Sequence, residues 1–169
     1  MNKTIFVYDS SIRRNQLRMT CPSVRYLGKV FIRNAKLVFK GHYTFGWPTL
    51  EKSKDSNDIV EGLLVQMTEA DFKSMERVVG LNKNLVKKKV NVIQNGYAKP
   101  AITYLIENKN FRYEIPLKEQ LSALCQGYED CRFKIDKIWN ALEICLNEYY
   151  ENDQNFEITI QKNYFKKEE

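Results

Sequence analysis

The sequence predicts a mixed α+β domain in which the strands come first and the helices pack late. Two observations support this class. Apolar and β-branched runs of strand length recur up to residue 106, and from Pro116 onward the apolar spacing becomes helical. Neither an internal repeat nor a linker divides the 169 residues. We therefore expect a single domain over 1–169, with a core at about 3–146 and a C-terminal extension over 147–169.

The first third of the chain predicts strands with one short helix between them. Residues 4–8 are a short apolar strand that runs into small polar residues, and 12–19 is an amphipathic helix. Residues 24–32 and 35–40 are predicted to be two strands in a hairpin or bend. Residues 41–58 are predicted to be a long loop, and long loops in compact domains often carry function.

The middle of the chain predicts a buried strand, a helix and a hairpin. Residues 59–66 are apolar enough for a central strand. The run Thr68-Glu-Ala-Asp71 resembles a capping box, and the helix that it starts ends at Gly80. Asn95-Gly96 lies between two β-patterned segments, over 86–93 and 101–106, and predicts a hairpin turn.

The last third is predicted to be helical up to about residue 149. Apolar residues recur at helical spacing over 117–127 and again over 135–149. Residues 155–165 instead alternate Phe156, Ile158 and Ile160, which predicts a short final strand.

The composition limits the possible partners. The formal charge is +6, from 27 Lys and Arg against 21 Asp and Glu, and the excess gathers in short, scattered clusters without a nucleic-acid motif. We interpret the clusters as a solvated basic face, with nucleic acid or an anionic ligand as the alternative. The sequence has neither a long apolar run nor a secretory signal, so we expect a cytoplasmic protein with no membrane partner.

Metal sites and disulfides are not expected. The sequence has one histidine, His42, and its four cysteines form no C-x-x-C motif. Three of the cysteines lie in predicted helices, so reduced core thiols are favoured over a disulfide framework or a zinc site. We expect no metal and no cofactor.

The most suggestive stretch is the end of the first strand, Tyr8-Asp9-Ser10-Ser11. Backbone N–H groups that converge at a strand end beside a helix N-terminus favour an anion such as a carboxylate or phosphate. A capped helix start explains the same residues without any ligand.

This loop and several later motifs resemble the γ-glutamylcyclotransferase-like (AIG2-like) family. The family opens with a strand and a Tyr-Gly-Ser-Asn loop, in place of which this chain has Tyr8-Asp9-Ser10-Ser11. Further similar motifs follow in the family's order: Cys21-Pro22, Leu27-Gly28-Lys29, Lys36-Leu-Val-Phe39, Pro48-Thr-Leu50, Val60-Glu-Gly-Leu-Leu64, Ala101-Ile-Thr-Tyr-Leu105 and Cys125-Gln-Gly-Tyr-Glu-Asp130. The resemblance implies a small mixed β-barrel with packed helices.

The resemblance also implies an activity. In the family, the amides of the loop bind the α-carboxylate of a γ-glutamyl group, and a glutamate just before the glycine that ends the middle helix removes a proton from the substrate amine. The amine then attacks the γ-carbonyl and releases 5-oxoproline. A carboxylate in a pocket suits both proton transfers.

This sequence departs from the family pattern at both positions. Val79 precedes Gly80 where the family has its glutamate, and valine carries no proton. Asp9 stands in place of the family's glycine and Ser11 in place of its asparagine. We expect Asp9 to tolerate a positive φ less well than glycine and to place a negative charge beside the expected carboxylate.

Three hypotheses follow. The first is a degenerate member that keeps a small-molecule pocket, for a γ-glutamyl compound or other anion, or acts as an interaction protein. The second is an active cyclotransferase with Glu76 or Asp9 as a relocated base, and the third is a basic module that binds protein or nucleic acid. The predicted site consists of one catalytic candidate, Glu76, and six ligand-binding candidates: Tyr8, Asp9, Ser10, Ser11, Val79 and Tyr104. Trp47 is expected near the same pocket.

Overall fold

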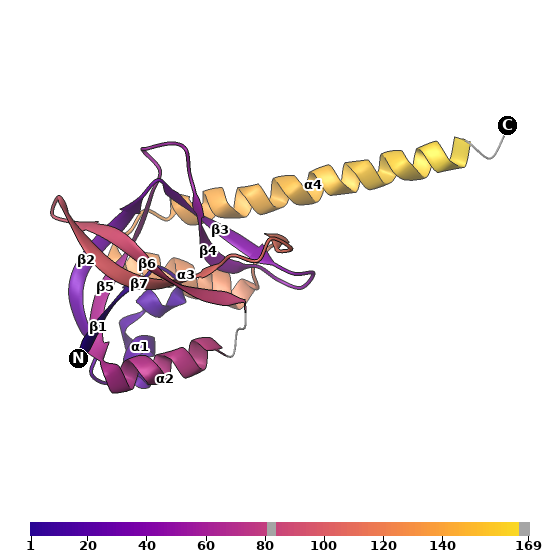
Figure 1. The fold of residues 1–169 in the computed structure, drawn as a ribbon. Coiled ribbons are helices and arrows are strands. Elements are labelled where there is room, and N and C mark those ends of the chain that lie inside the picture. The colour runs from indigo at the N-terminus through magenta and orange to yellow at the C-terminus, as the bar shows by residue number, and fades with distance from the viewer. Residues whose placement is uncertain (81–83, 166–169) are drawn as a thin grey trace.

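The structure is a computed structural model that describes residues 1–80 and 84–165, with side chains described over 1–79 and 84–153. Strands occupy most of the first two thirds and long helices the last third (Figure 1). The elements are β1 (Asn2–Val7), η1 (Ser10–Ile12), α1 (Arg14–Thr20), β2 (Arg25–Arg33), β3 (Ala35–Gly41), β4 (Trp47–Lys52), β5 (Ile59–Thr68), α2 (Glu69–Gly80), β6 (Leu85–Gln94), β7 (Tyr97–Ile106), β8 (Arg112–Tyr113), α3 (Lys118–Cys131) and α4 (Asp136–Phe165).

Five of the described strands close into a barrel in the order β1-β5-β2-β6-β7. Strand β1 pairs antiparallel with β5 along its whole length, and it meets β7 in parallel where Ile5 lies opposite Ile102. The inward residues of these strands are apolar and buried, as expected for a filled small barrel. The predicted class, a mixed small β-barrel with packed helices, is confirmed.

The hairpin predicted at Asn95-Gly96 is confirmed. It joins β6 and β7, which pair in unbroken register from Leu85 with Ile106 to Gln94 with Tyr97. Asn95 and Gly96 have φ of 51° and 83°, the positive values that a two-residue turn of this kind requires.

The long loop predicted over 41–58 is wrong in part, because β4 lies inside it. Strand β4 pairs with β3, and with β8 they form a second sheet in the order β4-β3-β8. Pro48 argues against a central strand, but β4 is an edge strand of this sheet, where a missing N–H is tolerated. Strands β2 and β3 belong to different sheets, so the bend at Asn34, and not a hairpin, connects them.

The start of α2 confirms half of the predicted capping box. The Thr68 hydroxyl accepts a hydrogen bond of 3.3 Å from the Asp71 backbone N–H. The Asp71 carboxylate accepts bonds of 2.6 Å from both the backbone N–H and the hydroxyl of Ser23, so it ties the helix to the segment before β2 instead of closing the box.

Helix α3 packs closely against η1, the short helix that follows Asp9. Ile12, Leu124 and Tyr128 are fully buried at this contact. A Cβ added at Gly127 would lie 2.6 Å from the Cγ1 atom of Ile12, which is closer than carbon atoms approach. Glycine at 127 therefore lets α3 hold the loop at the end of β1 in place.

The strand predicted over 155–165 is wrong, because helix α4 continues without a break from Asp136 to Phe165. Its first part packs beside β3, and its far part runs outward from the barrel (Figure 1). An isolated strand there would leave its backbone groups without a neighbouring strand, whereas a helix satisfies them internally. In the described part of the chain, no helix is long and apolar enough to span a bilayer.

Candidate functional site

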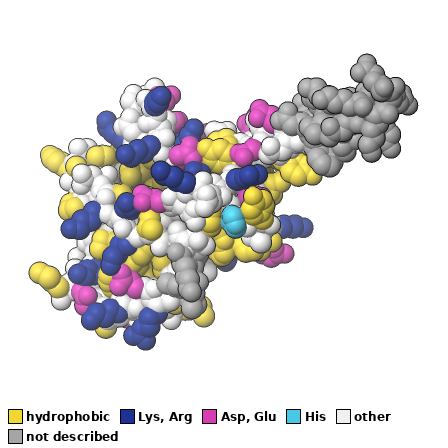
Figure 2. All heavy atoms as spheres, turned by 45° about the vertical axis from the view of Figure 1, so that its right-hand side comes forward, with side chains coloured by type: hydrophobic (Ala, Val, Ile, Leu, Met, Phe, Trp, Pro, Cys, Tyr) yellow, Lys and Arg dark blue, Asp and Glu magenta, His cyan; other side chains and the backbone are white. Residues whose placement is uncertain are grey.

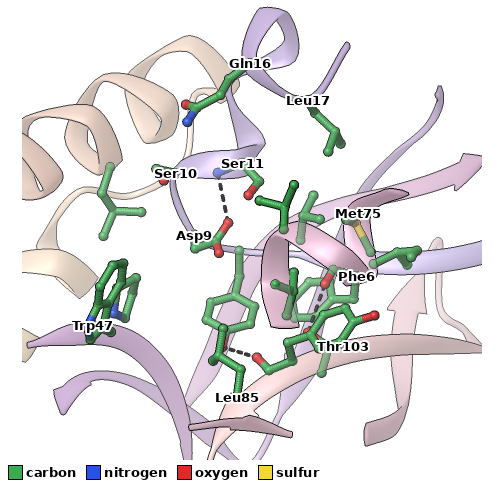
Figure 3. Close-up of a pocket in the computed structure, with 18 of the residues that line it drawn as sticks. Phe6, Asp9, Ser10, Ser11, Gln16, Leu17, Trp47, Met75, Leu85 and Thr103 are labelled. Carbon is green, nitrogen blue, oxygen red and sulfur yellow. Dashed lines mark hydrogen bonds between the residues drawn. The ribbon is translucent and has the colours of Figure 1, made fainter. Parts of the chain in front are cut away.

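A cavity of about 230 Å³ lies at the end of β1, between the barrel and the helices that cover it. Figure 3 shows Asp9 near the middle of this region, with Ser11, Gln16, Trp47 and Met75 around it. Nine of the described helices and strands and the loop after β1 contribute to the wall, and its residues include Val7, Tyr8, Asp9, Ser10, Ser11, Leu17, Trp47, Met75, Val79, Leu85, Thr103, Tyr104, Gln120 and Leu124.

The fold brings together all six predicted ligand-binding candidates at this cavity: Tyr8, Asp9, Ser10, Ser11, Val79 and Tyr104 line it. They come from the loop after β1, from η1, from α2 and from β7. Trp47, at the start of β4, lines the same cavity. Their roles in binding stay predictions. Glu76 is not among the residues that line the cavity.

Asp9 takes a conformation that differs from the expectation. Its φ is −92° and its ψ is −162°, which is extended backbone open to any residue, so the predicted difficulty with a positive φ does not arise. Its Oδ1 atom accepts a hydrogen bond of 2.8 Å from the backbone N–H of Ser11. The aspartate side chain therefore caps η1. It accepts the hydrogen bond of the Ser11 amide, which the sequence analysis had expected to bind an anionic ligand.

Tyr8 is held by the barrel and not left free for a ligand. Its side chain is 4% exposed, and its hydroxyl donates a hydrogen bond of 2.7 Å to the backbone carbonyl of Tyr104. Burial, with a further effect of Asp9, raises the pKa of the Tyr8 phenol far above its ordinary value. The hydroxyl therefore stays protonated and acts as a donor.

Glu76 faces β6 at the edge of the site. Its Oε1 atom lies 2.6 Å from the Lys87 ammonium, and the Tyr104 hydroxyl donates a longer bond of 3.4 Å to the same oxygen. Burial, followed by the charge of Glu76, raises the pKa of the Tyr104 phenol well above its ordinary range. Tyr104 thus lies between the cavity, which it lines, and the Glu76–Lys87 ion pair.

The wall of the cavity carries a negative charge. Among its described lining residues, Asp9 is the one with a formal charge. The nearby arginines do not line it: the Arg14 and Arg18 guanidinium groups lie over the ring of Tyr26, at 5.1 and 5.9 Å from its centre. Most of the other lining residues are apolar.

Gln120 is a lining residue that the sequence analysis missed. It lies in the first turn of α3, and its Oε1 atom is buried without a hydrogen-bond partner among the described residues. In the sequence it stands in the polar run Lys118-Glu119-Gln120, which looks like an ordinary exposed helix start. Nothing in the local sequence distinguishes Gln120 from an exposed residue at the start of a helix.

Metal-ligating groups and thiols do not add to this site. Within the described residues, no group of three His, Cys, Asp or Glu side chains is placed to hold a metal ion. His42 lies after β3 and stacks on Phe111, with ring centres 5.8 Å apart. The four cysteines are free, and none of them lines the cavity.

Comparison with solved structures identifies the fold. A γ-glutamyl cyclotransferase superposes with a TM-score of 0.71 at 20% identity, over 85% of this chain and 88% of that one. A yeast γ-glutamyl cyclotransferase specific to glutathione superposes with a TM-score of 0.58 at 13% identity, over 88% and 96%. YkqA from Bacillus subtilis gives 0.63 at 13% identity, over 82% of this chain and 52% of its own.

Sequence comparison gives no closer relation. No protein-family model matches the chain, and no curated protein matches it significantly. The structural matches at 13 to 20% identity show a common fold. The chemistry of the site is a separate question, which depends on its own residues.

Proposed function

We propose that this chain, which has the γ-glutamyl cyclotransferase-like fold, binds a small molecule in the cavity beside Asp9 without catalysing cyclotransfer. The observation that carries the proposal is Val79. Val79 lines the cavity, and it stands at the sequence position where the resemblance implies the catalytic glutamate. An isopropyl group neither accepts a proton from a substrate amine nor returns one to a leaving amine.

Neither relocated base is well placed for the reaction. Glu76 is outside the lining of the cavity and holds an ion pair of 2.6 Å with Lys87. Asp9 lines the cavity, but one of its oxygens is engaged by the Ser11 N–H group. Catalysis by a carboxylate needs its oxygen within hydrogen-bond reach of the substrate amine, and a displacement of about 1 Å is costly.

The shape of the site supports retained binding. A cavity enclosed by apolar side chains from separate elements, with a few polar groups converging on it, is typical of a small-molecule site. Phe6, Leu124 and Ile5 in its wall are at most 1% exposed, so the surrounding core is well packed.

An active cyclotransferase with Glu76 as base is the second candidate. The observation in its favour is the Tyr104 hydroxyl, which links the cavity to Glu76 through a hydrogen bond of 3.4 Å. The basic binding module is less favoured, because Figure 2 shows Lys and Arg side chains dispersed over the visible face and not gathered into one patch.

The test is release of 5-oxoproline from a panel of γ-glutamyl amines and dipeptides, with an established γ-glutamyl cyclotransferase as the positive control. The proposal expects no release above background from the wild type. Release that disappears with Glu76→Gln would overturn it and identify Glu76 as the base. Release that disappears with Asp9→Asn would do the same for Asp9.

Binding is tested separately by thermal unfolding of the 169-residue chain against a library of small molecules. A ligand that binds only the folded state raises the unfolding temperature in a saturable manner. Val79→Phe, which fills part of the cavity, should abolish the shift, whereas Lys73→Ala, at an exposed position of the same helix outside the cavity wall, should leave it nearly unchanged. A library without any such hit would contradict the proposal.

A further inference from the structure

We infer that the ligand of this cavity is a small organic cation, an amine with an apolar body, and that Asp9 is its counter-ion. The inference rests on the proposed function, because it takes for granted that the cavity binds a ligand. It concerns the class of that ligand, which the fold leaves open.

The first argument is charge. Among the described lining residues, Asp9 is negatively charged and no Lys or Arg is present to neutralise it. Asp9 also has no ion pair within 4.0 Å among the described residues. An unpaired carboxylate beside an apolar wall favours a cationic partner over a neutral or anionic one.

The second argument is the hydrogen-bonding capacity of the wall. The Ser11 N–H group occupies Oδ1 of Asp9, which leaves Oδ2 without a partner among the described residues. Gln120 lines the same cavity, and its Oε1 atom is buried and unpartnered. Both are acceptors, and an ammonium group is a donor with three N–H bonds and no acceptor. A buried acceptor without a donor, such as the Gln120 oxygen, is unfavourable, so a donor-rich ligand is favoured.

The same features disfavour a carboxylate ligand. A carboxylate near the loop would meet the like charge of Asp9, and the Ser11 amide that could bind it already has an acceptor. The nearest arginines of α1 are stacked on Tyr26 outside the cavity wall. The charge preference of this site is therefore opposite to that of a site that binds an α-carboxylate.

Size and wall composition define the rest of the ligand. The cavity holds about 230 Å³, below the ~300–1,000 Å³ of sites for drug-sized molecules, so the ligand is small. Phe6 and Trp47 present aromatic rings, and Val79 and Leu85 present aliphatic groups. An amine that carries a short alkyl or aryl group would bury that group here, and a ring face also attracts its cation.

The experiment compares three probes of similar size by calorimetry on the 169-residue chain: 2-phenylethylamine, the neutral 2-phenylethanol and the anionic 3-phenylpropionate. We expect the amine to bind roughly tenfold or more tightly than either of the others, as for one charge-assisted hydrogen bond. Asp9→Asn should remove this preference, and Gln120→Met should weaken amine binding by a smaller factor.

The controls separate binding from folding. Asparagine at position 9 keeps an oxygen for the Ser11 N–H group, so Asp9→Asn should unfold close to the wild-type temperature. Asp130→Asn makes the same change at an exposed position of α3, outside the cavity, and should leave the amine preference unchanged.

The inference is overturned if 3-phenylpropionate binds as well as the amine, if Asp9→Asn keeps the amine preference, or if the amine does not bind. Binding of the alcohol or the carboxylate without the amine would overturn the ligand class and leave the proposed cavity function standing. Release of 5-oxoproline by the wild type would overturn the proposed function itself, independently of these affinities.

Discussion

The hydroxyl of Tyr8 and the backbone carbonyl of Tyr104 form a hydrogen bond of 2.7 Å across the closure of the barrel. Tyr8 follows β1 and Tyr104 belongs to β7, and these strands also share a parallel bridge at Ile5 and Ile102 and a bond of 2.9 Å from the Thr103 hydroxyl to the Phe6 carbonyl. The Tyr8 bond therefore reinforces the seam of the barrel next to the cavity. It also explains why a lining tyrosine is buried and directed into the protein.

Tyr8→Phe should destabilise the fold by about 1–2 kcal/mol, because it leaves a carbonyl without its donor. Urea unfolding gives the free energy of unfolding. The matched control is Tyr128→Phe: the Tyr128 hydroxyl is buried without a partner among the described residues, so its removal should be neutral or stabilising. Equal losses in the two variants would contradict the assigned role of Tyr8.

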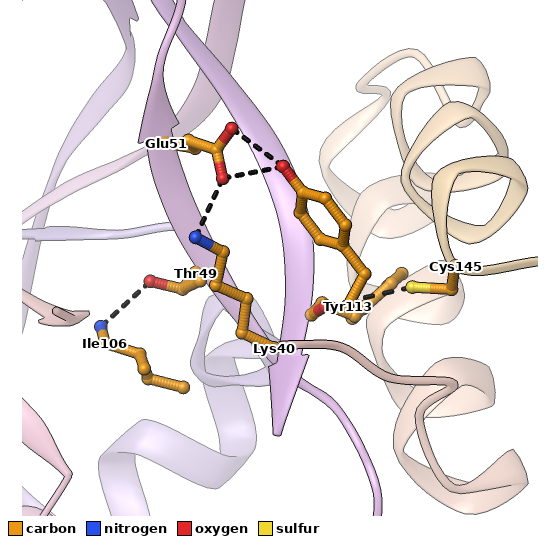
Figure 4. Close-up of polar contacts among 7 residues, drawn as sticks. Lys40, Thr49, Glu51, Ile106, Tyr113 and Cys145 are labelled. Carbon is orange, nitrogen blue, oxygen red and sulfur yellow. Dashed lines mark hydrogen bonds and ion pairs between the residues drawn. The ribbon is translucent and has the colours of Figure 1, made fainter. Parts of the chain in front are cut away.

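A second prediction concerns pH and the polar cluster beside β8. Figure 4 shows Glu51 between Lys40 and Tyr113, with an ion pair of 2.8 Å to Lys40 and bonds of 2.9 and 3.0 Å from the Tyr113 hydroxyl. Burial opposes ionisation of Glu51, but the Lys40 and Tyr113 contacts outweigh it and hold its pKa below the ordinary 4.5.

A carboxyl group whose pKa is lower in the folded state stabilises the fold above its unfolded pKa and loses this effect on acidification. Glu51→Gln should therefore lower the free energy of unfolding at pH 7, and the difference from wild type should shrink as the pH falls below 4.5. Glu69→Gln, which removes the more exposed pair with Lys3, should change stability little at either pH. A pH-independent effect of Glu51→Gln would contradict the prediction.

A third prediction concerns thiol reactivity. Burial raises the pKa of all four cysteine thiols, and that of Cys145 reaches about 11. Thiolate is the reactive form, so the native thiols should react slowly with Ellman's reagent at pH 8, and half-buried Cys125 should react first. Denaturation should release four fast thiols. Cys125→Ser should remove the native signal, and fast labelling of Cys21 or Cys145 would contradict this order.

A fourth prediction concerns the contact of α3 with η1. Alanine gains about 1 kcal/mol over glycine in a helix, but a Cβ at position 127 meets the Ile12 side chain at 2.6 Å, and overpacking costs about 1–3 kcal/mol. Gly127→Ala should therefore destabilise the protein by about 1 kcal/mol. Ser122→Ala, at an exposed position of the same helix, should be neutral or slightly stabilising. Chemical denaturation of both variants shows whether each substitution lowers or raises the free energy of unfolding.

Much of the barrel could be predicted because its signals are local. Asn95-Gly96 specifies its turn through the positive φ values of two adjacent residues, and the apolar run over 59–66 is buried because it has few polar groups to solvate. Strand β4 was missed because its pairing partner, not its composition, makes it a strand. The end of α4 was predicted to be a strand because short alternating segments are ambiguous without their surroundings.

By itself, the sequence predicted the class of fold, most of the order of its strands and helices, the loop after β1, and Val79 at the position where the resemblance places a glutamate. These are properties of single positions and short spacings. The tertiary structure alone decided that Asp9 caps its own loop, that Glu76 turns to Lys87, and that Gln120 brings an unpartnered oxygen to the cavity. Each of these depends on which atoms the fold brings within hydrogen-bond distance. The local sequence does not show which residues far apart in the chain will lie close together.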